Sequence, residues 1–565
     1  MRKIRLYITL TFGLAAILFT ACEDMLDMKS DSVVFDEDHQ LNSANDSLYS
    51  AMGILSLVQD IGERYVLLGE LRGDLVTVPA SAPLDYQNVS NFNSMEGGEV
   101  FGLKRDYYNV INNCNVALQR MDTTITENSQ KVMLGEYAAI KTFRDWTFLQ
   151  VALTYGKVNF TEQPVLEYND AEMNGNELTL DQLVPVLISD LLPLAGVNVP
   201  NYGNVDGLQS SNFFIKPALL LADLFLYAGD YQMAAQLYYK VIDDAGYIMS
   251  VDNSNHWTTS VKSDAVINHL YTYTSEVISE IPFASDAKKY HPNLVNITYN
   301  PSPSVLPANW FINEMNSFTH YHIDRIGINN ITGYLEGDLR GMIEDRDGKI
   351  FYSSFGNIAK GFSSGENMIT KFMANGVEYS SVSNPNNSFF DNSHSPILTR
   401  EIPIYRIPHL YLRYAEAVNR AGCPSVAFAV LKYGLRNETL NDSTKVNPIE
   451  LLENPLWTNF NDYKYDGNYG TAMRGRGFGI PVDQTGYVIP EFTSKTDSIE
   501  WVEERILEEM AAETAFEGNR FFDLLRISKH RANHPQFIAT KIGRRFENPA
   551  EIESRLKDIN NLWIK

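Results

Sequence analysis

The residues that could perform catalysis or bind a metal are scattered along this 565-residue sequence. No HExxH pattern is present, and that pattern would place two histidines on one helix face for zinc. His530 and His534 are four residues apart, but no third candidate ligand lies near them in the sequence. Carboxylates are abundant, yet no spacing singles out an acid–base pair. We therefore expect no catalytic residue, no metal and no cofactor.

A glycine-rich segment, Gly467–Gly479, contains Arg474-Gly475-Arg476-Gly477-Phe478-Gly479. Such segments bind phosphate when they join a strand to a helix in a βαβ unit, and no such unit surrounds this one. The chain also carries a formal net charge of −24. Because nucleic acids are bound mainly through lysine and arginine, we expect no nucleic-acid partner.

The N-terminus is similar to a bacterial lipoprotein signal. A basic segment at residues 2–5 precedes the apolar run Leu6–Thr20, which is shorter than the roughly 20 residues of a membrane-spanning helix. The run leads into Phe19-Thr20-Ala21-Cys22, where small residues before a cysteine resemble a lipobox. Residues 1–21 are thus a predicted signal peptide. Lipidation of Cys22 would tether the mature chain to a membrane.

Two cysteines remain, Cys114 and Cys423, and both fall in segments with the apolar periodicity of a helix. An exported protein could join them in a disulfide, because the compartment is oxidising. Buried free thiols are nevertheless common in protein interiors. We expect these two thiols to be buried and unpaired.

The framework that must position any binding residue is helical. Apolar residues recur at spacings of three and four along Pro217–Tyr247, which places them on one face of each of two successive helices. Ala228-Gly229-Asp230 separates the two runs, and a glycine just after a helical run is a common stop. The small residues Ala222 and Ala234, followed by Tyr238, resemble the spacing of a tetratricopeptide repeat. We predict a helix-turn-helix pair here.

The helical period recurs through much of the chain. Thr179-Leu180-Asp181-Gln182 is a capping box that predicts the start of another helix. The residues after His530 are predicted to be a polar tail. The sequence therefore predicts a mainly α protein built from helix pairs. The other predicted helical segments are Ala44–Ile61, Glu63–Val76, Lys104–Met121, Lys131–Tyr155, Pro408–Gly422, Pro424–Leu435, Asp497–Gly518 and Asn519–His530.

Two long stretches lack the helical period. Ser81–Val100 is rich in Pro, Asn, Ser and Gly and is predicted to be a loop. Val251–Arg400 has a similar composition but is too apolar for disorder, so we predict a loop-rich lobe with a few short strands, for example around Lys349–Phe355. The charged run Asp338–Gly348 is predicted to be a solvated turn. Long loops in compact proteins often carry binding residues.

Four short blocks of the sequence together resemble the motifs of a known protein family. They are Leu68-Gly69-Glu70-Leu71-Arg72-Gly73-Asp74, Phe143-Arg144-Asp145-Trp146 leading to Tyr155-Gly156, Ile402-Pro403-Ile404-Tyr405-Arg406 leading to Tyr414-Ala415-Glu416-Ala417, and Phe516-Glu517-Gly518-Asn519-Arg520-Phe521-Phe522-Asp523-Leu524-Leu525-Arg526. Together with the lipobox they resemble the SusD/RagB family of outer-membrane nutrient-binding lipoproteins, over nearly the whole mature chain. The departures are Asn159 in place of a proline, and His409 and Leu410 in place of small or acidic residues.

The resemblance implies a SusD-like bundle of tetratricopeptide-like helix pairs with a loop-rich lobe. It divides the mature chain into an N-terminal region, 22–250, and a C-terminal region, 251–565. The charged residues of the blocks are expected to form partly buried ion pairs that fix helix against helix, since such groups are costly to separate. These structural residues are Arg406, Glu416, Glu517, Arg520, Asp523 and Arg526.

The resemblance also implies a function and a partner. A nutrient, most commonly a glycan or oligosaccharide, would be held between this chain and a SusC-like TonB-dependent β-barrel transporter. Glu23 and Asp24, directly after Cys22, resemble an export tag, so the expected location is the outer face of the cell outer membrane. The alternatives are a peptide-binding member of the same uptake system, a surface enzyme that degrades polysaccharides, and a scaffold for protein contacts.

Aromatic residues in the loops are the candidates for ligand contact. Sugar C–H faces stack on aromatic rings while the hydroxyls bond to polar groups, and the resemblance places ligand sites on loops. From loop composition we predict Tyr86 and Phe92 of the early loop, with Trp310 and Tyr321 of the central region, as ligand-binding residues.

Overall fold

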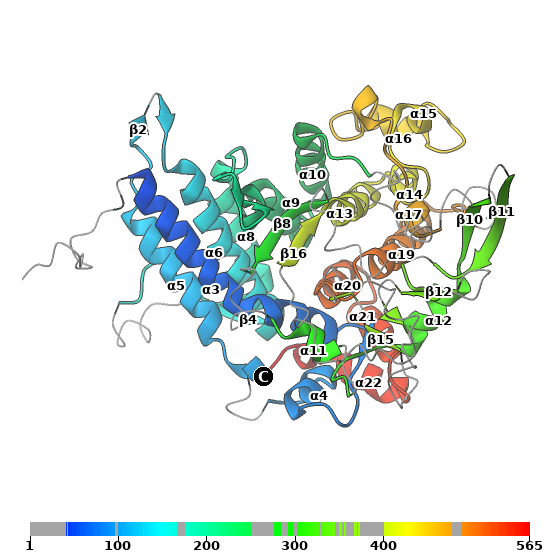
Figure 1. Ribbon diagram of the computed structural model, residues 1–565, viewed down its shortest axis with the longest axis horizontal. Helices are drawn as coiled ribbons and strands as arrows, with labels where there is room; N and C mark the ends of the chain where they lie inside the picture. Colours follow the sequence, from blue (N-terminus) through cyan, green and yellow to red (C-terminus); the bar gives the residue numbers. More distant parts are fainter. Residues whose placement is uncertain are drawn as a thin grey trace, which may run out of the picture.

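The structure is a computed structural model, and its main body is helical, as predicted (Figure 1). Cys22 and the rest of the predicted lipoprotein signal lie outside the residues that it describes. The described residues are 41, 43–95, 100–127, 129–166, 176–249, 276–283, 292–298, 302–326, 329–338, 340–344, 350–352, 355–356, 367–369, 371–372, 401–476 and 487–565.

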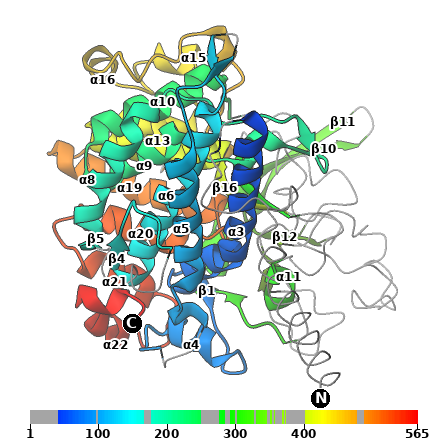
Figure 2. The same cartoon turned by 90° about the vertical axis from the view of Figure 1, so that its left-hand side faces the viewer.

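Three long helices form one side of the molecule: α3 (Ala44–Leu71), α5 (Arg105–Arg120) and α6 (Leu134–Tyr155). They pack against one another and lie side by side in both views (Figures 1 and 2). α3 begins after Ser43, whose hydroxyl accepts the N–H of Asp46 at 3.2 Å. The sequence predicted two separate helical segments here, and the structure instead has one continuous helix of 28 residues.

The predicted helix pair is confirmed as α9 (Pro217–Ala228) and α10 (Tyr231–Ala245). Asp230 begins α10, because its carboxylate accepts the N–H of Met233 at 3.2 Å. Ala222 and Ala234 are both fully buried. By length and composition the run Ser210–Ala228 could cross a membrane, but 67% of it is buried inside the fold, as expected of a core helix.

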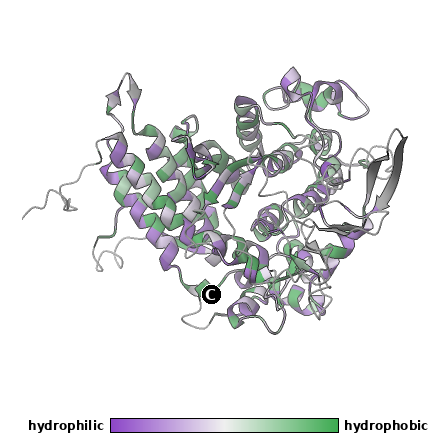
Figure 3. Ribbon diagram, in the orientation of Figure 1, coloured by the Kyte–Doolittle hydropathy of each residue, from purple (hydrophilic) through white to green (hydrophobic). Residues whose placement is uncertain are grey.

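The predicted capping box begins α8 (Leu180–Leu191), which packs between α6 and α9. Its two reciprocal contacts are both present: the Thr179 side chain accepts a backbone N–H, and Gln182 accepts the N–H of Thr179 at 3.0 Å. Hydrophobic residues concentrate where these helices meet, while α5 alternates between hydrophilic and hydrophobic residues (Figure 3). Cys114 and Cys423 are buried and free, as predicted.

The second half of the chain continues the bundle and closes it. α13 packs on α10, α14 and α19 pack on α13, and α20 returns to pack on α3. The contact between α3 and the turn before α20 is a close backbone approach, because a Cβ on Gly69 would lie 1.8 Å from the carbonyl oxygen of Gly518. The main helices of this half are α13 (Ile407–Arg420), α14 (Pro424–Lys432), α19 (Lys495–Glu513), α20 (Arg520–Lys529), α21 (Gln536–Gly543) and α22 (Pro549–Leu556). The predicted polar tail after His530 is therefore largely helical.

Short helices lie in the segments that connect the long helices and the strands. The predicted loop Ser81–Val100 contains the helix α4 (Leu84–Ser90), so the prediction of a loop was wrong there. The helix has only about two turns, and its composition is typical of a loop. The remaining short helices are η1 (Val100–Gly102), η2 (Leu192–Leu194), η3 (Ser210–Phe213), α11 (Leu294–Thr298), α12 (Asn309–Ser317), α15 (Asn437–Leu440), α16 (Pro448–Glu453), η8 (Tyr463–Tyr465), α17 (Thr471–Arg476) and η10 (Ile559–Leu562).

The strands of the described residues form two-stranded antiparallel ladders. The longest, β10–β11, stands at the right of Figure 1 beside the short strands of the loop-rich lobe. The predicted strands near Lys349–Phe355 are confirmed as β13 and the start of β14. The pairs are β1 (Val76–Thr77) with β9 (Leu306–Pro307), β2 (Thr126–Glu127) with β3 (Gln130–Lys131), β4 (Lys157–Phe160) with β5 (Asn176–Thr179), β6 (Asn204–Val205) with β7 (Leu208–Gln209), β8 (Val277–Pro282) with β16 (Glu401–Arg406), β10 (Thr319–Ile326) with β11 (Asn329–Glu336), β12 (Met342–Glu344) with β13 (Ile350–Tyr352), and β14 (Phe355–Gly356) with β15 (Met368–Ile369).

The prediction of a solvated turn at Asp338–Gly348 was wrong at Asp338 and Arg340, and residues 339 and 345–348 lie outside the described part of the structure. Asp338 and Arg340 are fully buried, with their side chains 2.8 Å apart. Arg340 also contacts Glu509 at 3.0 Å and Glu513 at 3.3 Å on α19. Burial alone would raise the pKa of Asp338, but the neighbouring arginines lower it to about 2. The charges therefore pair inside the fold.

Arg476 of the glycine-rich segment joins the same buried group. It contacts Asp338 at 3.2 Å and Glu509 at 3.0 Å. Arg474 is also buried and pairs with Glu276 at 2.7 Å. These two guanidinium groups are thus engaged with carboxylates inside the fold.

The charged residues of the four blocks form buried ion pairs, as predicted. Deleting one member of such a pair leaves the other charge buried and unpaired, which is why these residues act as structure. The contacts are Arg526 with Glu416 at 2.6 Å, Arg526 with Asp523 at 2.9 Å, Arg520 with Asp74 at 2.6 Å, and Arg406 with Glu517 at 2.7 Å.

Candidate functional site

Two of the predicted ligand-binding residues, Tyr86 and Phe92, lie on and just after α4. The Tyr86 ring packs 5.5 Å from Phe101, and burial raises its pKa to about 12. Phe92 has a positive φ of 55° and lies 6.3 Å from the ring of Phe521 on α20. Both side chains are half-buried against protein.

The other two predicted residues lie in the loop-rich lobe. Trp310 is on α12, and its indole N–H donates to the carbonyl oxygen of Asp74 at 2.5 Å. The guanidinium of Arg544 lies 3.7 Å above the Trp310 ring and also pairs with Asp74. Tyr321 is on β10 opposite Tyr334, and its side chain lies outside the described part of the structure. A ligand-binding role for these aromatic residues stays a prediction.

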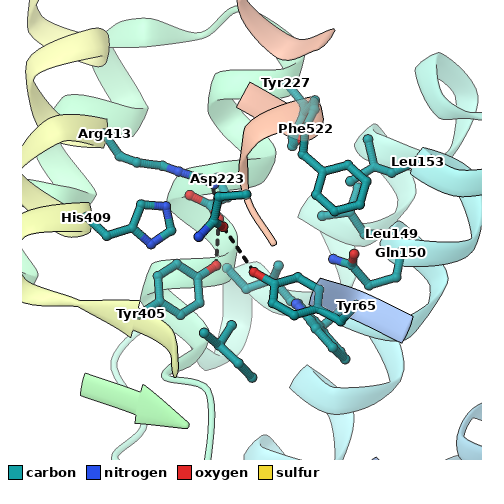
Figure 4. A pocket seen from close by; sticks show the side chains of 14 residues that line it. Tyr65, Leu149, Gln150, Leu153, Asp223, Tyr227, Tyr405, His409, Arg413 and Phe522 are labelled. Atoms are coloured by element: carbon teal, nitrogen blue, oxygen red, sulfur yellow. Dashed lines mark hydrogen bonds and ion pairs between the residues drawn. The ribbon is translucent and has the colours of Figure 1, made fainter. Parts of the chain in front are cut away.

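A small buried cavity lies among α6, α9, α13 and α20 (Figure 4). Asp223 accepts a hydrogen bond from Tyr405 at 2.5 Å and a second one from Tyr238. Its other contact is an ion pair with Arg413 at 2.7 Å. The lining residues are Tyr65, Trp146, Leu149, Gln150, Leu153, Leu220, Asp223, Tyr227, Ile404, Tyr405, His409, Arg413, Asn519 and Phe522, all of them buried.

The electrostatics of the buried cavity follow from its burial. Burial, and then the charge of Asp223, raise the pKa of Tyr238 and of Tyr405 far above the usual value. Burial and the charge of Arg413 lower the pKa of His409, which stacks 5.6 Å from Tyr405. The cavity volume of about 20 Å³ is close to the minimum for one water molecule. This cavity is a structural junction and is too small for a nutrient.

A larger opening lies where the C-terminal segment meets the ends of α6 and α20, and we call it the C-terminal cleft. Its volume is about 400 Å³, within the range of about 300–1,000 Å³ typical of small-molecule sites. Four separate segments of the chain converge on it. The lining residues are Tyr155, Gly156, Lys157, Thr179, Leu180, Asp181, Leu525, Lys529, His534, Ile559, Asn560, Trp563 and Lys565.

Trp563 is held in a defined position at the edge of the cleft. Gly156 ends α6 with a φ of 78°, and a Cβ there would lie 2.7 Å from Cγ and Cδ1 of the indole and 2.8 Å from Cδ2. These nearly equal distances place Gly156 over one face of the five-membered ring. The N–H of Ile564 donates to the carbonyl oxygen of Thr154 at 3.1 Å, which fixes the segment to α6.

The charged residues around the cleft are mostly paired. Lys157 contacts Glu177 across the β4–β5 ladder at 2.8 Å, and Lys529 contacts Asp181. Nδ1 of His534 is hydrogen-bonded to the hydroxyl of Ser528 at 2.8 Å. Burial and the charge of Lys529 lower the pKa of His534, so its ring is neutral at pH 7. The cleft thus combines an indole, apolar walls and polar groups. Two of its lysines are paired with carboxylates, and the third, Lys565, donates to the side-chain amide of Asn561.

Sequence reasoning missed this cleft. Its signal was the apolar group Leu562-Trp563-Ile564 in a stretch that was otherwise polar. That group could have indicated a C-terminal segment packed on the bundle. The sequence could not indicate that Gly156, more than four hundred residues earlier, would lie under the indole.

Comparisons with known proteins bear on the fold. No protein-family model matches the sequence, and no curated protein is significantly similar to it. A SusD superfamily protein from Bacteroides thetaiotaomicron VPI-5482 superposes with a TM-score of 0.54 and 15% identity, covering 92% of this chain and 99% of that chain. The chain has the SusD fold.

Two further solved structures support this assignment of the SusD fold. NanU of B. fragilis superposes with a TM-score of 0.52 and 14% identity, covering 92% of this chain and 94% of that chain. A SusD-like carbohydrate binding protein from Bacteroides vulgatus ATCC 8482 superposes with a TM-score of 0.50 and 14% identity, covering 86% of this chain and 84% of that chain. The SusD-like bundle predicted from the four sequence blocks is therefore confirmed as a fold.

Proposed function

We propose that this chain is a surface lipoprotein that binds a glycan or oligosaccharide and delivers it to a SusC-like TonB-dependent transporter in the outer membrane. The observation that carries the proposal is the SusD fold, matched over 92% of the chain. The lipobox ending at Cys22 supports the anchor. A protein of the same fold is described as a SusD-like carbohydrate binding protein, which supports the class of nutrient. We propose a binding role and no catalytic one.

The partner is tested by copurification from detergent-solubilised outer membrane with an affinity tag on this chain. We expect a stoichiometric TonB-dependent β-barrel to copurify. Cys22→Ser is the matched control, because loss of the acyl chains should release the chain from the membrane fraction. Recovery of the wild-type chain alone in mild detergent would contradict the proposed delivery role.

The nutrient class is tested by presenting the mature chain to glycan and peptide arrays. Binding to glycans with no binding to peptides is the expected result. Binding to peptides alone would contradict the proposal of a glycan ligand and would favour a role of the same fold in peptide uptake. Hydrolysis of a bound polysaccharide would contradict the assignment as a binding protein.

A further inference from the structure

We propose that the C-terminal cleft binds a neutral mono- or disaccharide with one sugar ring against the indole of Trp563. The inference rests on the proposed function, since it takes a sugar as the nutrient. It adds the place of binding and the charge class of the ligand. It also separates the site from Tyr86, Phe92 and Trp310, since none of the three lines the cleft.

The composition of the cleft matches the two-sided chemistry of a sugar. A pyranose ring has an apolar C–H face and a polar rim of hydroxyls, and it requires both kinds of surface. Leu180, Leu525 and Ile559 supply apolar wall beside the indole, and Asn560 supplies an amide. Ile559 is 39% exposed, so this apolar surface is reachable from solvent. Such a combination suits an amphipathic ring better than a fully apolar ligand.

The indole is positioned before any ligand arrives. Gly156 lies under one face of Trp563, and the backbone on its C-terminal side is bonded to α6. An aromatic side chain that is already fixed loses little conformational entropy when a ligand binds. Trp563 is half-buried and lines the cleft. Trp563 can therefore serve as a rigid contact surface for a sugar ring.

The pairing of charges favours a neutral sugar over an acidic one. The ammonium groups of Lys157 and Lys529 are each engaged by a carboxylate, Glu177 and Asp181 respectively. At these two lysines a ligand carboxylate would have to displace the carboxylate already present or lie close to it. Lys565 is exposed and donates to the side chain of Asn561 at 3.2 Å.

His534 offers a polar contact that a neutral sugar can use. Its Nδ1 is occupied by the hydroxyl of Ser528 at 2.8 Å. The opposite ring nitrogen, Nε2, makes no hydrogen bond within the described part of the chain. Since His534 lines the cleft, we expect Nε2 to bond to a sugar hydroxyl there. His534→Gln keeps a polar side chain but moves its hydrogen-bonding atoms, so it tests this contact without removing the aromatic platform.

The test measures binding of maltose, cellobiose, lactose and digalacturonate to the full mature chain by saturation-transfer NMR and titration. We expect at least one neutral disaccharide to bind and digalacturonate to bind more weakly. Trp563→Leu should raise Kd at least tenfold, and Trp563→Phe should retain part of the affinity. His534→Gln should raise Kd by a smaller factor. Trp501→Leu is the matched control, a half-buried tryptophan of α19 outside the cleft, and should leave Kd unchanged.

The outcomes separate this inference from the proposed function. If a neutral sugar binds with the same Kd to wild type, Trp563→Leu and His534→Gln, the cleft is not the site and the glycan-binding function stands. Stronger binding of digalacturonate would overturn the neutral class. If no sugar binds while peptides do, both the cleft inference and the glycan function are wrong. Should Trp563→Leu fail to fold, Trp563→Phe and His534→Gln decide the question.

Discussion

The buried cavity and the C-terminal cleft share two helices, α6 and α20. Leu153 and Phe522 line the cavity, whereas Tyr155 and Leu525, only two and three residues further along, line the cleft. The cavity holds about 20 Å³ and the cleft about 400 Å³. In the cavity Asp223 and Arg413 are buried and paired with each other. In the cleft Lys157 and Lys529 are paired with carboxylates at the exposed rim.

With the cleft as the proposed binding site, the difference implies that one scaffold keeps the residues needed for stability apart from those that contact the ligand. At the buried cavity, Asp223 is shared by two tyrosines and an arginine, so each partner depends on the others. At the cleft, the helices end and solvent enters. Residues there can be replaced at smaller cost to folding, which is what a site that varies with its ligand requires. The following predictions test this contrast, from the largest expected effect to the smallest.

The largest effect is expected at the centre of the buried cavity. Asp223→Ala leaves Arg413 buried with Asp523 as its remaining ion-pair partner among the described residues, and it removes the acceptor of two tyrosine hydroxyls. The free energy of unfolding should fall by about 3–5 kcal/mol, the usual result of removing one partner of a buried ion pair. Urea denaturation measures it. The matched control is Asp181→Ala at the cleft rim, whose side chain is 70% exposed, and equal shifts in the two variants would contradict the contrast.

The second prediction tests the contact between Gly156 and the indole of Trp563. Gly156→Ala introduces a Cβ that would meet the indole at 2.7 Å in a backbone conformation with φ of 78°. We expect a loss of about 1–3 kcal/mol and weaker sugar binding, because the C-terminal segment must move. Gly203→Ala is the control, since its φ is 81° and nothing lies within 4 Å of a Cβ there. A loss of sugar binding in Gly203→Ala as large as in Gly156→Ala would contradict the role of the indole contact.

The third effect is a pH dependence of stability that arises in the buried cavity. The pKa of His409 is lowered in the folded chain by burial and by Arg413, with smaller contributions from Arg526 and Arg406. Below pH 6.5, about the ordinary pKa of histidine, His409 therefore takes up a proton when the chain unfolds. The stability that neutral His409 contributes is complete above that pH and is lost as the pH falls below it, by up to about 1.4 kcal/mol per pH unit.

The pH dependence of His409 is measured by urea denaturation between pH 7.5 and pH 5, comparing wild type with His409→Gln. We expect a shallower loss of stability in the variant as the pH falls, because glutamine does not titrate. Parallel curves for the two proteins would show that His409 is protonated equally in both states. That result would contradict the buried environment assigned to it.

The smallest effect is expected at the rim of the cleft. Lys157 and Glu177 form an exposed pair, with side chains 56% and 60% exposed. Such pairs contribute little to stability, because solvent screens them. Lys157→Met should change the urea midpoint little. A loss as large as that of Asp223→Ala would show that the rim is part of the folding core.

Much of the fold was predictable from the sequence. The helix pair at Pro217–Ala245 follows from local spacing and a glycine stop, and the capping box at Thr179 fixes the start of α8. Asp338 and Arg340 were misread because the local composition resembles a turn, while the partners of Arg340 on α19 lie about 170 residues away. Helix α4 was missed because its composition is that of a loop.

The candidate site was far less predictable than the fold. Loop composition drew attention to Tyr86 and Trp310, which the structure packs against Phe101 and Arg544. Trp563 and Gly156 are far apart in the sequence, so no local sequence pattern indicates their contact. Helix periods are local properties of a sequence, whereas a cleft is formed by segments that only the fold brings together.

The most direct test of this account is hydrogen–deuterium exchange of the mature chain with and without a neutral disaccharide that binds it. We predict slower exchange in three segments of the C-terminal cleft, residues 155–157, 529–534 and 559–565. Residues 404–413 beside the buried cavity should exchange at the same rate in both samples. Protection confined to residues 84–92 and 309–318 would contradict the account and would place the ligand on the loop aromatics instead.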